Sequence, residues 1–446
     1  MPGGLSAAPL TAAEIGGPLR ALLGGAPSSL AVAVSGGPDS LALTLVLAAW
    51  GERAGVDVQA LTVDHGLRSE AAREAAWTQT VCRARGIPHV IVQPSEPLPA
   101  GAGQARARDA RYDTLLRACA QRGIGTLALA HHREDQAETV LLRARRASGP
   151  AGLAGMPARR EAGGVQLIRP VLNVPKARLA ATLEATGVGW VSDPTNADPK
   201  HARPRVRAAM AASPELDASK LAGVARAMGR ARASVERAAI SVLAGHLAWG
   251  TGGHAWLRAA ALASTAPVAR EALARLLAAV GGTAGQPRAG QLEALRREMD
   301  GGGPRTRTLG GCVLVPRPGG WVIAREPGRT PVTSLAPGTD TWHDGRVRVA
   351  VAGAAPGGLR AGALGVAGWR SVTAESPALR GCGVPPPARP ALTAVWDADG
   401  PAAVPDVGWL RPGASARAWP ARWEVRAAAR WDAPPFAVAP PGFGIT

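Results

Sequence analysis

The hexapeptide Ser-Gly-Gly-Pro-Asp-Ser at residues 35–40 is the strongest indicator of the fold of this 446-residue chain. It follows the apolar run Leu30–Val34, which predicts a buried strand, and precedes Leu41–Leu47, which predicts a buried helix. A glycine-rich turn between a strand and a helix leaves backbone N–H groups free at the helix N-terminus, where an anion is stabilised. The two glycines let the backbone approach a phosphate closely, and the two serines add hydroxyl donors. The predicted phosphate-binding residues are Ser35, Gly36, Gly37, Pro38, Asp39 and Ser40.

This turn lacks the lysine of the Gly-x4-Gly-Lys-Ser/Thr phosphate-binding pattern. It carries Asp39 instead, a carboxylate that does not bind a triphosphate by itself but is suited to hold Mg²⁺. The alternative is a Ser/Gly turn without a ligand, which the strand–turn–helix context disfavours. The turn therefore predicts nucleotide binding with a metal ion at Asp39.

Strands and helices alternate from residue 30 to about residue 147. The strands are expected at 58–63, 90–92 and 126–130, and the helices at 69–85, 104–122 and 135–146. This alternation predicts an α/β fold with a doubly wound, mostly parallel sheet, in which ligands bind beyond the carboxyl ends of the strands. The 35–40 turn, Asp64-His65 and His131-His132 each follow a strand directly, so we expect them to meet at one edge of the sheet.

The composition and the predicted secondary structure change along the remainder of the chain, which indicates several domains. We expect an N-terminal extension at 1–27, a nucleotide-binding domain at 28–215, a helical domain at 216–328 and a divergent C-terminal region at 329–446. Residues 148–164 are predicted to form a loop, residues 175–186 a helix, and residues 311–315 and 320–324 a hairpin. In the last region Pro, Gly and Trp increase, which favours short β-strands over helices.

The formal net charge is +18, and nearly all of the basic residues are arginines. A basic surface of this size indicates a polyanionic partner such as a nucleic acid, although a GC-rich genome would also enrich arginine. No apolar span of about twenty residues is present, and the first thirty residues do not resemble a signal peptide. Four scattered cysteines without a CxxC pair argue against structural zinc, an iron–sulfur cluster or disulfides, so we expect a cytoplasmic protein.

Two further clusters carry candidate chemistry. In His131–Thr139, His131 and Asp135 are four residues apart and are expected to share a face at a helix start, where they could bind a metal or a nucleotide phosphate. An acidic helix N-terminus favoured by the helix dipole is the alternative. Arg108 and Arg111 are three residues apart on one helix face; for an isolated arginine pair, a merely solvated face is the better interpretation.

Taken together, the clusters resemble those of the tRNA(Ile)-lysidine synthase family, within the PP-loop ATP pyrophosphatases. The segments appear in the family's order, namely 35–40, 64–68, 107–112, 131–139, 152–156 and 193–196. The resemblance is strong over about 28–210, weaker to about 325, and absent from 330 onward.

This resemblance implies a two-step ligase reaction. ATP would adenylate the wobble cytidine of a tRNA(Ile) with a CAU anticodon, and free lysine would then displace AMP to give lysidine, switching decoding from AUG to AUA. Arg108 and Arg111 would act on the α-phosphate, and Asp39 would hold Mg²⁺ on the departing pyrophosphate. His131 and Asp135 would lie at the adenylate or receive the lysine amine, with His131 one candidate general base.

The chain departs from the family pattern at two places. Ala147 stands after Arg146 where the family has Gly, and Pro204 stands where it has Asn. The basic cluster around Pro204 is expected to contact tRNA through Arg203, Arg205 and Arg207, with a solvated basic turn as the alternative.

Three other functions compete with this one. A tRNA cytidine thiolase would need cysteines for sulfur or a cluster, and a GMP- or NAD-type synthetase would not need a basic surface. The third is a non-catalytic RNA-binding module with a degenerate nucleotide pocket. The expected partners are tRNA(Ile), ATP and L-lysine, without a membrane; the oligomeric state is left open, with a homodimer among the options.

Overall fold

The computed structural model describes residues 7–64, 66, 69–96, 103–191, 202–282, 287–301, 305–344, 347–352, 358–411, 421–425 and 431–440. The chain divides into two compact units. The first comprises Met1–Ala233 together with Pro435–Thr446, and the second comprises Ser234–Pro434. No helix of the described residues is long and apolar enough to cross a membrane.

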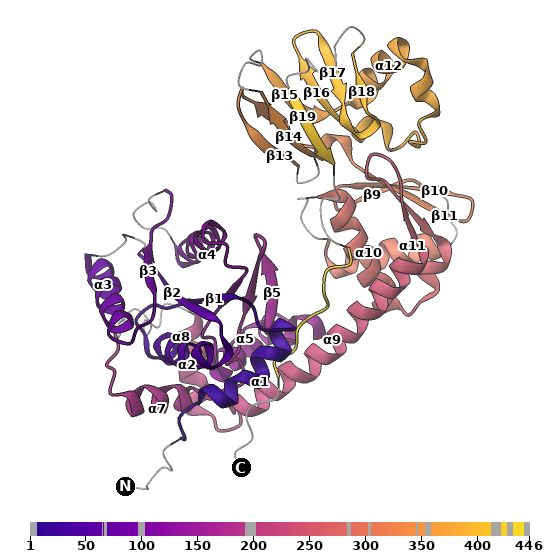
Figure 1. Cartoon of the computed structure of the whole chain (residues 1–446). Helices are drawn as coiled ribbons and strands as arrows, with labels where there is room; N and C mark the ends of the chain where they lie inside the picture. Colours follow the sequence, from indigo (N-terminus) through magenta and orange to yellow (C-terminus); the bar gives the residue numbers. More distant parts are fainter. Residues whose placement is uncertain are drawn as a thin grey trace. The chain divides into compact units, whose positions relative to one another are not determined.

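The first unit is built on a six-stranded sheet with the order β3-β2-β1-β4-β6-β5 (Figure 1). Its strands are β1 (Ser29–Ala33), β2 (Asp57–Val63), β3 (His89–Val92), β4 (Thr126–Ala128), β5 (Arg159–Ala162) and β6 (Val165–Ile168). All neighbouring pairs are parallel except β5 with β6. Because β1 lies between β2 and β4, the direction of winding changes at β1, and ligands bind beyond such a switch point. The predicted doubly wound sheet is confirmed.

Helices cover both faces of this sheet. One face packs against α1 (Ala12–Leu23), α2 (Pro38–Ala54) and α7 (Lys176–Thr186), and their leucines share a core with the strands. The other face packs against α4 (Gln104–Gln121) through Leu115 and Cys119. Burial of Leu41, Leu43 and Leu47 fixes α2 closely, so its N-terminus is held rigidly at the end of β1.

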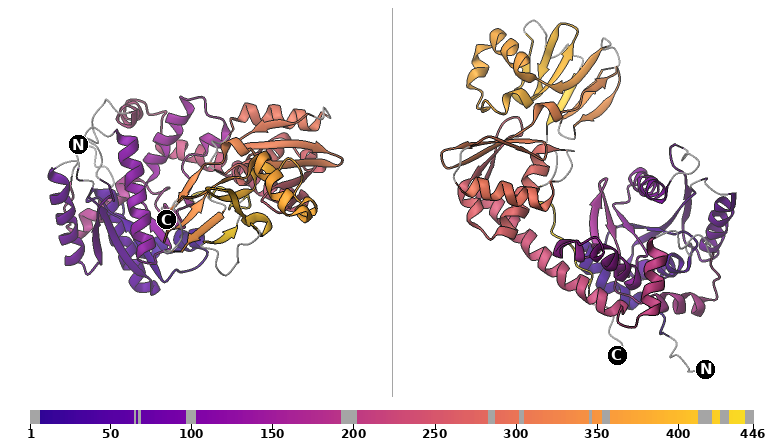
Figure 2. Two further views of the ribbon diagram at one scale, coloured as in Figure 1. Left: turned by 90° about the horizontal axis from the view of Figure 1, so that it is seen from above. Right: turned by 180° about the vertical axis from the view of Figure 1, so that it is seen from behind.

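The first unit also contains α3 (Ser69–Ala84), α5 (Arg133–Ala144), α6 (Pro150–Leu153) and α8 (Ala202–Ala212). The end of the chain returns to this unit and lies beside α9 (Ala218–His246) (Figure 2). There the Ala158 N–H donates to the Ala437 carbonyl over 2.8 Å, and Ala439 joins the core. The Arg232 guanidinium stacks 4.7 Å from the centre of the Phe436 ring.

The second unit contains three antiparallel sheets with the orders β7-β8-β11-β10-β9, β12-β15-β16-β17-β18 and β13-β14-β19. Its strands are β7 (Leu247–Trp249), β8 (Ala255–Arg258), β9 (Arg307–Leu309), β10 (Cys312–Arg317), β11 (Gly320–Arg325), β12 (Thr333–Leu335), β13 (Asp340–His343), β14 (Val347–Val351), β15 (Leu359–Ala363), β16 (Thr393–Asp397), β17 (Gly400–Val404), β18 (Trp409–Leu410) and β19 (Ala421–Val425). Its helices α10 (Ala266–Gly281), α11 (Ala289–Asp300) and α12 (Gly365–Glu375) pack on these sheets. The predicted hairpin is confirmed as β10 and β11.

Three sequence predictions were wrong in part. The expected loop at 148–164 contains α6 and β5, because β5 is an edge strand whose residues stay largely outside the core and show no apolar pattern. β7 and β8 interrupt the region of helical spacing, and α12 lies in the tail where we expected strands. β5 and β7 each pair with the next strand of the chain, across Gly163-Gly164 and across residues 250–254, so these hairpins had glycine turns that the sequence analysis did not use.

The two departures from the family pattern have different local consequences. Ala147 follows α5 with a φ of 50°, the left-handed region that glycine tolerates better. Pro204 falls in the first turn of α8, where the missing N–H would have no helical partner in any case. The proline is therefore accommodated, whereas the alanine adopts a costly backbone conformation.

Candidate active site

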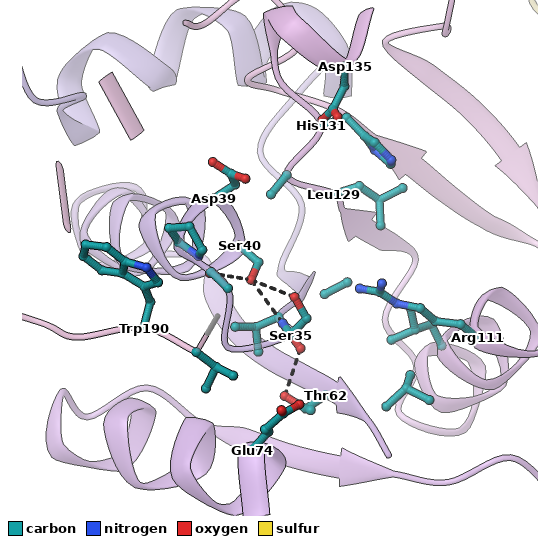
Figure 3. Close-up of a pocket in the computed structure, with 18 of the residues that line it drawn as sticks. Ser35, Asp39, Ser40, Thr62, Glu74, Arg111, Leu129, His131, Asp135 and Trp190 are labelled. Carbon is teal, nitrogen blue, oxygen red and sulfur yellow. Dashed lines mark hydrogen bonds between the residues drawn. The ribbon is translucent and has the colours of Figure 1, made fainter. Parts of the chain in front are cut away.

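The 35–40 segment forms a closed loop between β1 and α2. Gly37 is the N-cap of α2 and Pro38 its first residue, a position that proline favours. The Ser40 hydroxyl donates to the Gly37 carbonyl over 3.0 Å and accepts from the Ser35 N–H over 3.1 Å (Figure 3). Ser40 thus braces the loop from within, a structural use that the sequence pattern did not suggest.

Gly36 is a position where only glycine fits. Its φ is 76°, and a Cβ atom there would lie 2.7 Å from the Thr78 hydroxyl and 3.2 Å from Val191 Cγ2. The Val191 N–H donates to the Gly36 carbonyl over 2.9 Å, which ties the segment after α7 to the phosphate loop. The loop is therefore preorganised by contacts on both sides.

A cavity of about 660 Å³ opens at this loop, beyond the carboxyl ends of β1, β2 and β4. Its walls bring together most of the sequence-predicted site, namely Ser35, Gly37, Pro38, Asp39, Ser40, Arg108, Arg111, His131, Asp135 and Arg207. Figure 3 shows Arg111 and Trp190 on opposite sides of the loop, with Asp39, His131 and Asp135 along its upper rim. The expected meeting at one sheet edge is confirmed for the 35–40 turn and His131-His132, whereas Asp64 does not line the cavity and His65 lies outside the described residues.

His132, to which the sequence analysis assigned no chemical role, lies among three carboxylates. Its Nε2 is 3.6 Å from Asp39 Oδ2 and 3.5 Å from Asp135 Oδ2, and its Nδ1 is 3.0 Å from Glu134 Oε2. Burial alone would lower the pKa of His132, but the carboxylates of Asp39 and Glu134 raise it to about 10. His132 is therefore an imidazolium at neutral pH, and it fixes the phosphate loop to the start of α5.

His131, the neighbouring residue, has the opposite electrostatics. Burial, reinforced by the charge of Arg169, lowers the pKa of His131 to about 3. Its Nδ1 is buried and has no hydrogen-bond partner among the described residues. A neutral imidazole with a free nitrogen facing a cavity is available to hydrogen-bond a ligand, but with so low a pKa it is a weak proton acceptor.

The geometry accords with comparisons to known proteins. The PP-loop domain family matches residues 19–213. The tRNA(Ile)-lysidine synthase of Rhodopseudomonas palustris is 45% identical over 215 residues, which cover 47% of this chain and 62% of that protein. The enzyme of that name from Methylobacterium sp. strain 4-46 is 41% identical over 318 residues, covering 69% of this chain and 91% of the relative. The one from Methylobacterium nodulans is 40% identical over 337 residues, covering 73% of this chain and 98% of the relative.

The chain belongs to the tRNA(Ile)-lysidine synthase family. The family resemblance expected from the clusters is thereby confirmed. The chain spans about three fifths of the length of the first relatives that it matches, 62%, 61% and 59%, and nearly all of the two Methylobacterium proteins.

The predicted basic cluster, Arg203, Arg205 and Arg207, lies in the first half of α8. Arg207 lies 2.5 Å from Glu138 Oε1 through its Nε and 3.7 Å from Asp135 Oδ1, and Arg203 lies 3.9 Å from Glu138 Oε2. Burial raises the pKa of Glu138 above its ordinary range despite the Arg207 charge. Both Arg205 and Arg207 are exposed, but only Arg207 of the two lines the cavity. Contact of these arginines with tRNA stays a prediction.

Three residues that the sequence analysis did not name also line the cavity, namely Glu74 on α3, Lys176 on α7 and Trp190 beyond α7. No local sequence pattern marks any of the three as a site residue. Of the named motifs, His65, Leu67, Arg68 and residues 193–196 lie outside the described residues. The GLAGM segment is described, and its Met156 N–H donates to Gln136 Oε1 on α5 over 2.7 Å.

Proposed function

We propose that this protein adenylates the wobble cytidine of a tRNA(Ile) with a CAU anticodon and then joins lysine to it, forming lysidine. The observation that carries the proposal is one cavity lined by the phosphate loop, Asp39, His131 and Asp135 in a chain that matches two named lysidine synthases over nearly their whole length. The product would pair with A instead of G, so the tRNA would decode AUA instead of AUG.

In the first step, the 2-carbonyl oxygen of cytidine bonds to the α-phosphorus of ATP. The bond from that phosphorus to the bridging oxygen breaks, and its electron pair leaves with pyrophosphate. The protein's task is to position the reactants and to neutralise the charge that develops on the phosphates. The loop N–H groups and the N-terminus of α2 serve the pyrophosphate, while Arg108 and Arg111 line the wall assigned to the α-phosphate.

A magnesium ion fits one feature of this loop. Asp39 Oδ1 is buried without a hydrogen-bond partner among the described residues, and a hard cation prefers such an oxygen. Among those residues no cluster of three metal-ligating side chains occurs, so phosphate oxygens and water would complete the coordination around Asp39. When bound, Mg²⁺ would neutralise phosphate charge.

In the second step, the lysine ε-amine bonds to C2 of the adenylated cytidine. The bond from C2 to oxygen breaks, AMP leaves with that oxygen, and the protons of the amine pass to solvent water. Asp135 is placed to receive the cationic amine, because its buried carboxylate lines the cavity beside His131. The low pKa of His131 favours a hydrogen-bonding role over that of a strong general base.

Pyrophosphate release provides the test. The purified protein is incubated with ATP and an unmodified tRNA(Ile) transcript bearing CAU, with and without lysine. We expect release that depends on the transcript and that proceeds without lysine in a single turnover. A small-molecule synthetase would release pyrophosphate without tRNA, and a non-catalytic RNA-binding module would release none; either result would contradict the proposal.

A further inference from the structure

The phosphate loop at residues 35–40 contains no lysine, but the cavity wall does. The chain has 51 lysines and arginines, of which only Lys176, Lys200 and Lys220 are lysines. Lys176, the first residue of α7, lines the cavity at the phosphate loop. An ammonium is a compact point charge that binds phosphate oxygens from any direction, whereas a guanidinium needs a planar, two-point partner.

A series of short contacts places Lys176 at the Asp39 end of the loop. The Lys176 N–H donates to Glu134 Oε2 over 2.9 Å, and that oxygen lies 3.0 Å from His132 Nδ1. His132 Nε2 in turn lies 3.6 Å from Asp39 Oδ2. Because α7 and α2 share the same core, the start of α7 is held rigidly relative to the start of α2.

Three other cations of the cavity wall have partners, and a fourth, Arg111, lies on α4 at the wall assigned to the α-phosphate. Arg207 pairs with Glu138, His132 lies among three carboxylates, and the Arg108 guanidinium stacks 5.3 Å from the Tyr112 ring centre. The Lys176 ammonium, by contrast, forms no ion pair with any residue that the structure describes, and its side chain is exposed. A cation without an anion, at the rim of an anion-binding loop, is suited to an anionic ligand.

We propose that Lys176 is a catalytic residue that binds the β- and γ-phosphates of ATP and stabilises the departing pyrophosphate. The assignment rests on the proposed adenylation. As the bond from the α-phosphorus to the bridging oxygen breaks, negative charge grows on the pyrophosphate, and the ammonium donates hydrogen bonds to it. No proton is transferred. Lys176 thus supplies from α7 the charge that other phosphate loops carry within their own sequence.

The test compares Lys176→Gln and Lys176→Arg with wild type, and uses Lys220→Gln as a matched control on an exposed part of α9. Single-turnover pyrophosphate release is measured at saturating ATP and tRNA. We expect Lys176→Gln to slow it about 10²–10³-fold, Lys176→Arg to recover part of the loss, and the control to match wild type. Adenylated tRNA, once formed by the variant, should react with lysine at the wild-type rate, since pyrophosphate has already left.

A binding measurement separates this proposal from the proposed function. Calorimetry without tRNA gives the preference of each protein for ATP over AMP, which reports contacts to the β- and γ-phosphates alone. We expect Lys176→Gln to lose about tenfold of that preference, even if no tRNA proves to be a substrate. The assignment would be overturned if the preference for ATP over AMP were unchanged in Lys176→Gln. It would also be overturned if adenylation and lysine transfer slowed equally, or if a higher tRNA concentration restored the rate. Unchanged thermal unfolding of the variants excludes a folding defect.

Discussion

Replacing His132 with Gln tests the charge balance on which the site depends. In the wild-type protein the buried imidazolium neutralises part of the charge of Asp39, Glu134 and Asp135. Glutamine keeps hydrogen-bonding groups of similar size but removes the positive charge. Three carboxylates would then face one another at the junction of the phosphate loop and α5.

The magnitude follows from the pKa. A rise from the ordinary 6.5 to about 10 corresponds to about 5 kcal/mol of stabilisation, since each pH unit is worth about 1.4 kcal/mol. Because the pKa is higher in the folded than in the unfolded protein, this stabilisation is complete below about pH 6.5. It declines as the pH rises from there toward 10.

Urea unfolding of wild type and His132→Gln at about pH 6.5, 7.5, 8.5 and 9.5 measures how the difference in their free energies of unfolding changes with pH. The difference in free energy of unfolding between the two proteins should shrink by about 1.4 kcal/mol per pH unit. Residues Ser234–Pro434 contribute equally to both proteins, so they do not affect this difference. His131→Gln is the matched control. Because the pKa of His131 lies below its ordinary value, His131 makes the free energy of unfolding depend on pH only between about pH 3 and 6.5. Above that range its contribution is constant. A difference that stays constant with pH, or the same slope in the control, would refute the reasoning.

Four further outcomes are expected. Asp39→Ala should leave the fold intact but reduce pyrophosphate release at least 10²-fold, and normal release would exclude the metal role. Ala147→Gly should raise the free energy of unfolding by about 0.5–1 kcal/mol, because the left-handed φ of 50° favours glycine; a loss of stability in urea unfolding would contradict this. Arg205→Ala should reduce the slope of log affinity for tRNA against log salt by about 0.7–0.9, and an unchanged slope would mean that Arg205 contacts no phosphate. Phe436→Ala should lower the unfolding free energy of the first unit by about 2 kcal/mol, since the half-buried ring contacts Arg232; unfolding at the wild-type urea concentration would contradict that.

The sheet edge that carries the cavity was predictable because its signals are local. The strand–turn–helix around residues 35–40 combines an apolar run, a glycine turn and a second apolar run within a short segment. The parallel alternation of elements then places Asp39 and His131 at the same edge. Neither inference needs contacts between distant segments.

The rest of the site depends on such contacts. His131 and His132 are adjacent and identical in type, yet only the folded chain shows which one faces the carboxylates. Lys176 and Trp190 reach the cavity from α7 and beyond it, where no local pattern marks them. β5 is a different case, because it pairs with β6 across Gly163-Gly164, a local hairpin signal that the sequence analysis did not use.

Mass spectrometry of nucleosides tests the central claim most directly. A tRNA(Ile) transcript with a CAU anticodon is incubated with the protein, ATP and lysine, then digested, with the methionine tRNA of the same anticodon as control. We expect one cytidine of the isoleucine tRNA to gain the mass of lysine less water, only when ATP and lysine are both present. Unmodified cytidine in an incubation that consumes ATP, or a product formed without lysine, would contradict lysidine synthesis by this protein.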